Sequence, residues 1–167
     1  MEPTVAEPRA LPAAASFLAF AGVSALASYL SKPRGAPFAA FRLASKPKWE
    51  LPNAAMGPAW ITGSALLGLS GWRAWQASRG TARGRTLGLW ATYLVQNAAT
   101  NLQGHGVGKT AWTDILGIVL LGAYATQVGK TSKLATWLVL PYIGWLAYTG
   151  VTSEAVRRKN PLLRRFF

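Results

Sequence analysis

Five stretches of about twenty residues, almost free of charge, alternate along the chain with shorter segments that carry most of the Lys and Arg. These stretches cover residues 11–31, 54–76, 86–103, 110–128 and 134–156. Roughly 20 residues of helix cross a hydrocarbon core about 30 Å thick. The pattern therefore predicts an all-α, five-helix transmembrane bundle that forms a single domain over residues 1–167. All connections except residues 32–53 are short, so consecutive helices are expected to be antiparallel neighbours.

Polar side chains in the third stretch recur at steps of three and four residues, which places them on one helix face. They are Tyr93, Gln96, Asn97, Thr100 and Asn101. Polar groups are unfavourable against lipid, so this face is predicted to point into the bundle.

The fifth and second stretches carry similar stripes. Tyr142 and Trp145 share a face of the fifth, while Trp60 and Ser64 share a face of the second with Gly68, where small residues allow close helix packing. Such groups either join helix to helix or line a cavity. The long connection over residues 32–53 is suited to be a lid, which favours the cavity, and indole, phenol and amide walls suit a flat, mostly apolar ligand with polar edges.

Composition agrees with a membrane protein, because 51% of the residues are hydrophobic and 14% are charged. The net charge of +13 could indicate nucleic-acid binding, but the basic residues lie between apolar stretches and form no basic helix face, so no nucleic acid is expected. Six Lys and Arg residues flank the spans on the N-terminal side and eleven on the other side, which predicts a cytosolic C-terminus. Four of the eight Trp residues are interpreted as anchors at the membrane interface, namely Trp72, Trp75, Trp112 and Trp137.

Candidates for metal binding or catalysis are sparse. The chain has no Cys, and its one histidine, His105, lies in a Gly-rich loop without partner ligands, so no metal site is predicted. Asp114 is interpreted as an acidic residue in the first turn of its helix. Glu154 is expected to form ion pairs with Arg157 and Arg158.

Several motifs resemble those of the translocator protein family, also called the tryptophan-rich sensory protein or TspO/MBR family. Residues 46–52, KPKWELP, and 56–60, MGPAW, are similar to the family's K-P-S-W-x-P-P and F-G-P-V-W at the same spacing. Further matches lie at Trp75, in the third stretch, in residues 141–149, PYIGWLAYT, and at Arg158 and Asn160. The similarity covers nearly the whole chain.

The resemblance implies five transmembrane helices, frequent homodimers, and a cavity that accepts porphyrins, sterols or benzodiazepine-type ligands. By position it places Trp49 and Pro52 in the lid, and Trp60, Asn101, Tyr142 and Trp145 in or beside the cavity. It requires no cofactor, although a porphyrin, haem or sterol is an expected bound molecule.

This sequence also departs from the family pattern. Leu102 and Gln103 follow Asn101 where the family has a Trp-rich segment, and Glu154 replaces the Tyr of the sterol-recognition pattern. The first difference removes aromatic residues that could stack on a tetrapyrrole, and the second breaks the sterol-recognition pattern.

The sequence is best interpreted as an integral membrane receptor that binds a hydrophobic small molecule for transport, sequestration or signalling. An enzyme that degrades porphyrins and a small-molecule transporter are the alternatives. No constellation for general acid or base catalysis appears, so the chain is not expected to be an enzyme. The expected partners are the ligand and membrane lipid. The expected location is the mitochondrial outer membrane or another organelle membrane in a eukaryote, and the cell envelope in a bacterium.

Overall fold

The computed structural model describes residues 10–30, 44–102 and 110–161. These residues fold into helices, with no strand in the described ranges. The helices are α1 (Ala10–Leu30), α3 (Asn53–Ala77), α4 (Gly80–Leu102), α5 (Thr110–Gly129) and α6 (Lys133–Lys159). The predicted all-α fold with five long helices is confirmed.

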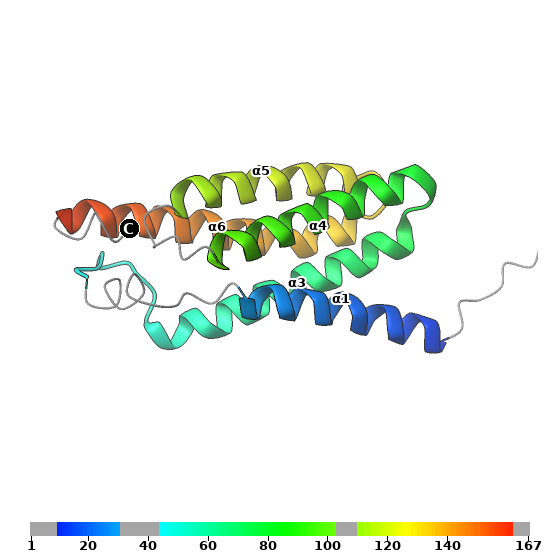
Figure 1. The fold of residues 1–167 in the computed structure, drawn as a ribbon, viewed down its shortest axis with the longest axis horizontal. Coiled ribbons are helices and arrows are strands. Elements are labelled where there is room, and N and C mark those ends of the chain that lie inside the picture. Colours follow the sequence, from blue (N-terminus) through cyan, green and yellow to red (C-terminus); the bar gives the residue numbers. More distant parts are fainter. Residues whose placement is uncertain (1–9, 31–43, 103–109, 162–167) are drawn as a thin grey trace, which may run out of the picture.

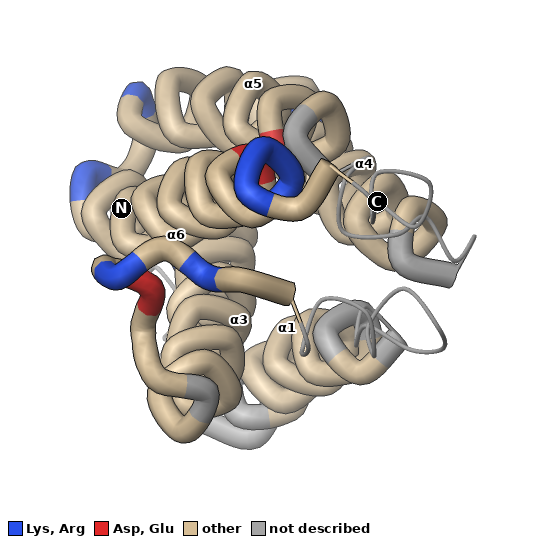
Figure 2. Tube along the Cα trace, turned by 90° about the vertical axis from the view of Figure 1, so that its left-hand side faces the viewer, with Lys and Arg blue, Asp and Glu red and all other residues tan. Residues whose placement is uncertain are grey.

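The helices pack as a closed ring in the order α1, α3, α6, α5, α4 and back to α1. Consecutive helices run in opposite directions and contact one another, as predicted, and α3 also touches α4 across the ring (Figure 1). Figure 2 looks along the helices, with Lys and Arg gathered near the ends of the bundle. One end of the ring therefore holds the start of α3, the start of α5 and the end of α6.

Helix α4, the third helix along the chain, begins at Gly80. This is six residues before the predicted start at residue 86, because the turn between α3 and α4 is very short. Gly80 adopts a φ of 53°, a left-handed conformation that glycine reaches without strain. Arg83 lies inside α4, donates from Nε to the carbonyl of Ser78 at 2.8 Å, and places its guanidinium 4.3 Å from the Trp75 ring. The basic turn predicted here is thus the first part of α4, and one of its arginines caps the end of α3.

Small residues on α3 let neighbouring helices approach closely. A Cβ on Gly68 would lie 2.9 Å from Ser24 Oγ on α1, and one on Gly71 would lie 2.7 Å from the Trp90 indole on α4. The predicted close packing at Gly68 is confirmed. On α1 the buried contact is made by Ser24, whereas Ala25 is exposed.

Large apolar side chains remain on the outer surface, as expected where lipid is the solvent. Trp112 on α5 and Trp137 on α6 are 79% and 69% exposed near the starts of their helices. Trp72 differs from the interface interpretation, because its Nε1 donates to Ser16 Oγ on α1 at 3.1 Å and its ring meets Phe17 edge-on. It joins α1 to α3.

Among the described helices, α6 is the one that is both long and apolar enough to cross a membrane by length and composition. Helix α3 contains four Gly, two Ser and three Trp residues, and the first six residues of α4 include two arginines, which lowers the mean hydropathy of these helices. Hydropathy alone therefore marks fewer spans than the pattern of charge-free stretches.

A buried hydrogen-bond network joins three helices at the end of the bundle where α6 begins. Ser70 Oγ on α3 donates to the carbonyl of Ala135 on α6 at 2.7 Å and lies 2.8 Å from the hydroxyl of Tyr124 on α5. All three residues are buried, so the network fixes the relative height of α3, α5 and α6.

Ser70→Ala is expected to lower the free energy of unfolding by about 1–3 kcal/mol, because it removes the partner of the buried Tyr124 hydroxyl and leaves the Ala135 carbonyl with only its helix hydrogen bond. Thr126→Ala is the control, since the exposed Thr126 hydroxyl donates to the Ala123 carbonyl of its own helix. Unfolding in detergent by increasing fractions of SDS measures both. Equal stability of the two variants would contradict the network's role.

Candidate functional site

Three aromatic side chains from α3, α4 and α6 meet inside the ring. The Tyr142 ring lies edge-on to Trp60, with centroids 6.3 Å apart, and edge-on to Tyr93, with centroids 5.8 Å apart. Tyr93 and Tyr142 are each 1% exposed. The structure thus brings together residues that sequence patterns placed on inward faces of three separate helices.

Gly63 explains how Tyr142 fits against α3. It lies one turn after Trp60, and a Cβ at Gly63 would stand 2.5 Å from Tyr142 Cδ2. Real Cβ atoms do not approach so closely, so the ring fills the space that the missing side chain leaves. The centre of the bundle is therefore packed at this level.

A second aromatic group continues along α6 toward that end of the bundle. The rings of Trp145 and Tyr148 stack with centroids 5.4 Å apart at 29°, and Trp49 meets Tyr148 edge-on at 6.0 Å. The backbone N–H of Leu51 donates to the Tyr148 hydroxyl at 2.7 Å. Trp49 is half exposed, and Pro52 is the exposed residue directly before α3.

The described part of the predicted lid is residues 44–52, here called the lid segment, and it is tied to the end of α6. Ser45 donates its N–H to Asn160 Oδ1 and accepts at its carbonyl from Asn160 Nδ2, both at 2.9 Å. Lys159 Nζ donates to the Lys46 carbonyl at 3.3 Å. Within the segment, Lys46 Nζ lies 2.8 Å from Glu50 Oε1, and the Glu50 side chain is 3% exposed.

Two buried indole N–H groups have no hydrogen-bond partner within the described ranges. They belong to Trp60 and Trp145, whose Nε1 atoms are both inaccessible to solvent. By contrast, Trp90 Nε1 donates to the Leu67 carbonyl at 3.1 Å. Buried donors are almost always satisfied, so this unsatisfied pair on neighbouring helices is a candidate for hydrogen bonding to a bound molecule.

The polar side chains that the sequence placed on one face of α4 differ in their contacts. Gln96 Nε2 donates to the Thr113 carbonyl on α5 at 3.4 Å and to Thr100 Oγ1 at 3.3 Å, which is the helix-joining role left open by the sequence. Asn97 is partly buried. The side chain of Asn101 and the whole of His105 lie outside the described residues.

Tyr148 is the site residue that sequence patterns missed. It was noted as part of a family-like motif and was not proposed as a contact, although it follows Trp145 by three residues and therefore lies on the same helix face. Its hydroxyl accepts from Leu51 in the lid segment, and the sequence does not predict where this segment lies relative to α6. The available signal was therefore the spacing alone.

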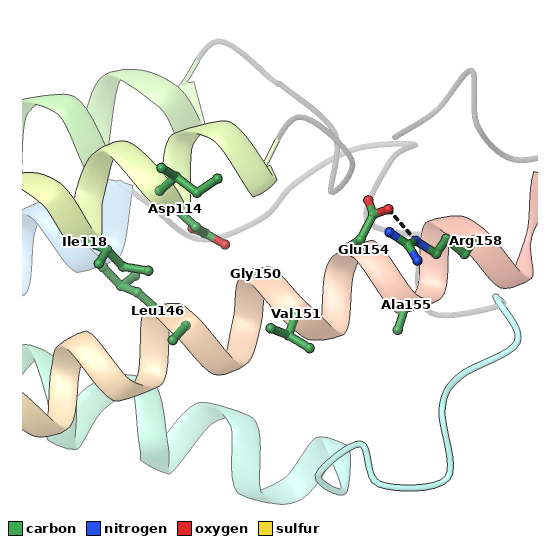
Figure 3. Close-up of a pocket in the computed structure, with 10 residues that line it drawn as sticks. Asp114, Ile118, Leu146, Gly150, Val151, Glu154, Ala155 and Arg158 are labelled. Carbon is green, nitrogen blue, oxygen red and sulfur yellow. Dashed lines mark hydrogen bonds and ion pairs between the residues drawn. The ribbon is translucent and has the colours of Figure 1, made fainter.

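An open groove of about 510 Å³ lies between α5 and α6, near the start of α5 (Figure 3). None of the nine predicted site residues lines it. Its lining residues are mostly apolar and include three charged ones: Asp114, Ile115, Ile118, Leu146, Ala147, Gly150, Val151, Glu154, Ala155 and Arg158.

The two acidic residues of this groove have distinct surroundings. Asp114 lies beyond the first turn, since α5 begins at Thr110, so the first-turn interpretation is wrong. Its Oδ2 accepts from Thr149 Oγ1 at 3.5 Å. Glu154 pairs with Arg157 and Arg158, each at 2.7 Å, and these predicted ion pairs are confirmed.

Comparison with known proteins agrees with the helical fold. The TspO/MBR family model matches residues 13–158. The human translocator protein is 32% identical over 121 residues, which cover 69% of this chain and 71% of that protein, and the pig protein is 31% identical over the same length and coverage. The cattle translocator protein is 26% identical over 137 residues, covering 78% and 80% of the two chains. The chain therefore belongs to the TspO/MBR family of helical-bundle membrane proteins.

Proposed function

We propose that this protein binds a flat, mostly apolar small molecule with hydrogen-bond acceptors at its edge, between Trp60 and Trp145 and beneath the lid segment. The observation that carries the proposal is the pair of buried indole N–H groups without partners. Tyr142 and Tyr93 form the floor of this site, and Trp49 and Pro52 belong to the segment above it.

The chemistry of the walls defines the ligand class. The aromatic rings offer apolar faces for stacking, while the two indoles donate hydrogen bonds and cannot accept them. A ligand with carbonyl or carboxylate oxygens satisfies both donors, whereas a pure hydrocarbon leaves them unsatisfied. A porphyrin with carboxylate side chains has this chemistry, and a sterol hydroxyl can accept one such bond.

Binding without chemical conversion is the function we favour. Sequestration, signalling or transfer across the membrane are all compatible with one ligand held under a lid, and the curated relatives carry the name translocator protein. The groove beside Asp114 lies outside this site, so its carboxylate is not assigned to the ligand.

A thermal-shift screen in detergent tests the proposal, because a ligand that binds the native state raises its stability. At a ligand concentration one hundred times the Kd, the gain is about 2.7 kcal/mol. We expect stabilisation by acceptor-bearing porphyrins and a clearly smaller effect from a polycyclic hydrocarbon of similar size. Equal shifts for both compounds would contradict the role of the indole donors, and no shift with any compound would contradict the proposed function.

A further inference from the structure

We propose that the open groove between α5 and α6 binds a single-chain lipid with a protonated primary amine, its ammonium on the Asp114 carboxylate and its chain against the apolar wall of the groove. The groove has a volume of about 510 Å³, which lies in the range of small-molecule sites. None of the residues assigned to the site beneath the lid segment lines it. The inference is therefore independent of the proposed function.

Asp114 carries the charge in the groove that has no counter-ion. The structure describes three acidic residues, and the other two, Glu50 and Glu154, form ion pairs with basic side chains. Within the described ranges Asp114 forms no ion pair, and its hydrogen bond from Thr149 Oγ1 is long at 3.5 Å. A carboxylate at membrane depth is unfavourable unless an opposite charge reaches it. A cationic group on a ligand in the groove supplies that charge.

Gly150 leaves this carboxylate accessible from the groove. In Figure 3 the Asp114 side chain points from α5 toward the part of α6 that contains Gly150. A Cβ at Gly150 would lie 3.4 Å from Asp114 Oδ2, so a longer side chain at this position would cover the carboxylate. Glycine here keeps an acceptor open where the two helices meet.

The order of residues along the groove indicates where the amine sits in the ligand. Asp114 lies four residues after the start of α5, about 6 Å along the helix axis. Ile118 and Leu146 line the groove on the side of the bundle centre, and Glu154 and Arg158 line it toward the end of α6. A chain joined directly to the amine can therefore pack against Ile118 and Leu146. A two-chain phospholipid carries its ammonium beyond the phosphate, in the headgroup layer, and does not place it at this depth.

The charge of the lining argues for a cation over other single-chain lipids. Two carboxylates, Asp114 and Glu154, and one guanidinium, Arg158, give the groove a net charge of −1, although the whole chain carries +13. Asp114 repels the carboxylate of a fatty acid, and the hydroxyl of a sterol or an alkyl alcohol offers no charge. The groove thus favours a donor with a positive charge, whereas the two indoles of the other site require an acceptor.

Photoaffinity labelling of the parent protein in nanodiscs tests the site. The probe is dodecylamine with a diazirine near the end of its chain, and it is expected to label peptides that contain Ile118 or Leu146. Dodecylamine is expected to compete at a concentration about tenfold lower than dodecanol, the effect of one charge-assisted hydrogen bond. Equal competition by the amine and the alcohol, or no label on these peptides, overturns the proposal.

Variants test the two parts of the site separately. Asp114→Asn keeps the shape of the side chain and is expected to abolish the advantage of dodecylamine over dodecanol. Ala147→Phe fills the groove from an exposed lining position and is expected to abolish the labelling. Ala123→Phe is its matched control, because Ala123 is exposed on α5 and does not line the groove, so its labelling should equal that of the parent.

Two results with these variants would overturn the proposal. An amine advantage that persists in Asp114→Asn would exclude the carboxylate as the recognition group. Equal labelling of Ala147→Phe and Ala123→Phe would place the probe outside the groove.

Discussion

Trp145→Ala is expected to weaken porphyrin binding by about thirtyfold or more, because truncating an aromatic anchor that a ligand covers removes about 2 kcal/mol or more of binding free energy. The variant removes both the ring face and the N–H donor that has no partner among the described residues. Quenching of the intrinsic Trp fluorescence during a porphyrin titration measures the Kd.

Two further variants separate the parts of this effect. Trp145→Phe keeps an aromatic face and removes the N–H, and we expect about a tenfold loss of affinity from the hydrogen bond alone. Trp137→Ala removes an indole that is 69% exposed on the same helix and should leave the Kd unchanged. A Trp145→Ala protein that binds as tightly as the parent would exclude the proposed site.

Gly63→Ala is expected to lower the free energy of unfolding by about 1–3 kcal/mol, the range for overpacking a filled core. The new methyl group would stand 2.5 Å from Tyr142 Cδ2, and the fully buried Tyr142 ring is held between Trp60 and Tyr93. Unfolding curves in mixed detergent with SDS report the change.

Gly57→Ala is the matched control for this substitution on the same helix. A Cβ at Gly57 meets nothing within 4 Å, so the change should stabilise α3 by up to about 1 kcal/mol through higher helix propensity. The opposite signs distinguish a packing conflict from a general effect of alanine. Stabilisation by Gly63→Ala would show that Tyr142 has room to move, and would contradict a packed floor.

The sequence predicted the helices well because charge and length constrain membrane spans strongly. Most predicted ends lie within about three residues of those in the structure, and the exception is the start of α4. There the arginines were interpreted as a loop, although Arg83 caps the preceding helix and lies within α4. A charged residue at a membrane edge is compatible with either a turn or the first turns of a helix, so sequence alone does not decide.

The site was harder to predict because a polar stripe identifies an inward face without identifying the neighbour. Tyr93 and Gln96 are three residues apart on α4, yet Tyr93 meets Tyr142 of α6 while Gln96 donates to α5. The Tyr148 contact and the groove beside Asp114 depend on how α6 sits against the lid segment and α5. These placements come from packing across the ring and have no local signature.

Two hydrogen bonds join Ser45 of the lid segment to Asn160, two residues separated by 115 positions in the chain. A ribosome delivers the N-terminal part of a protein first, so residues 44–52 emerge long before the end of α6. The cover can dock only after the last helix has been inserted. The docking of residues 44–52 on α6 is therefore a late event in biogenesis, and a nascent chain halted before Asn160 would lack this attachment.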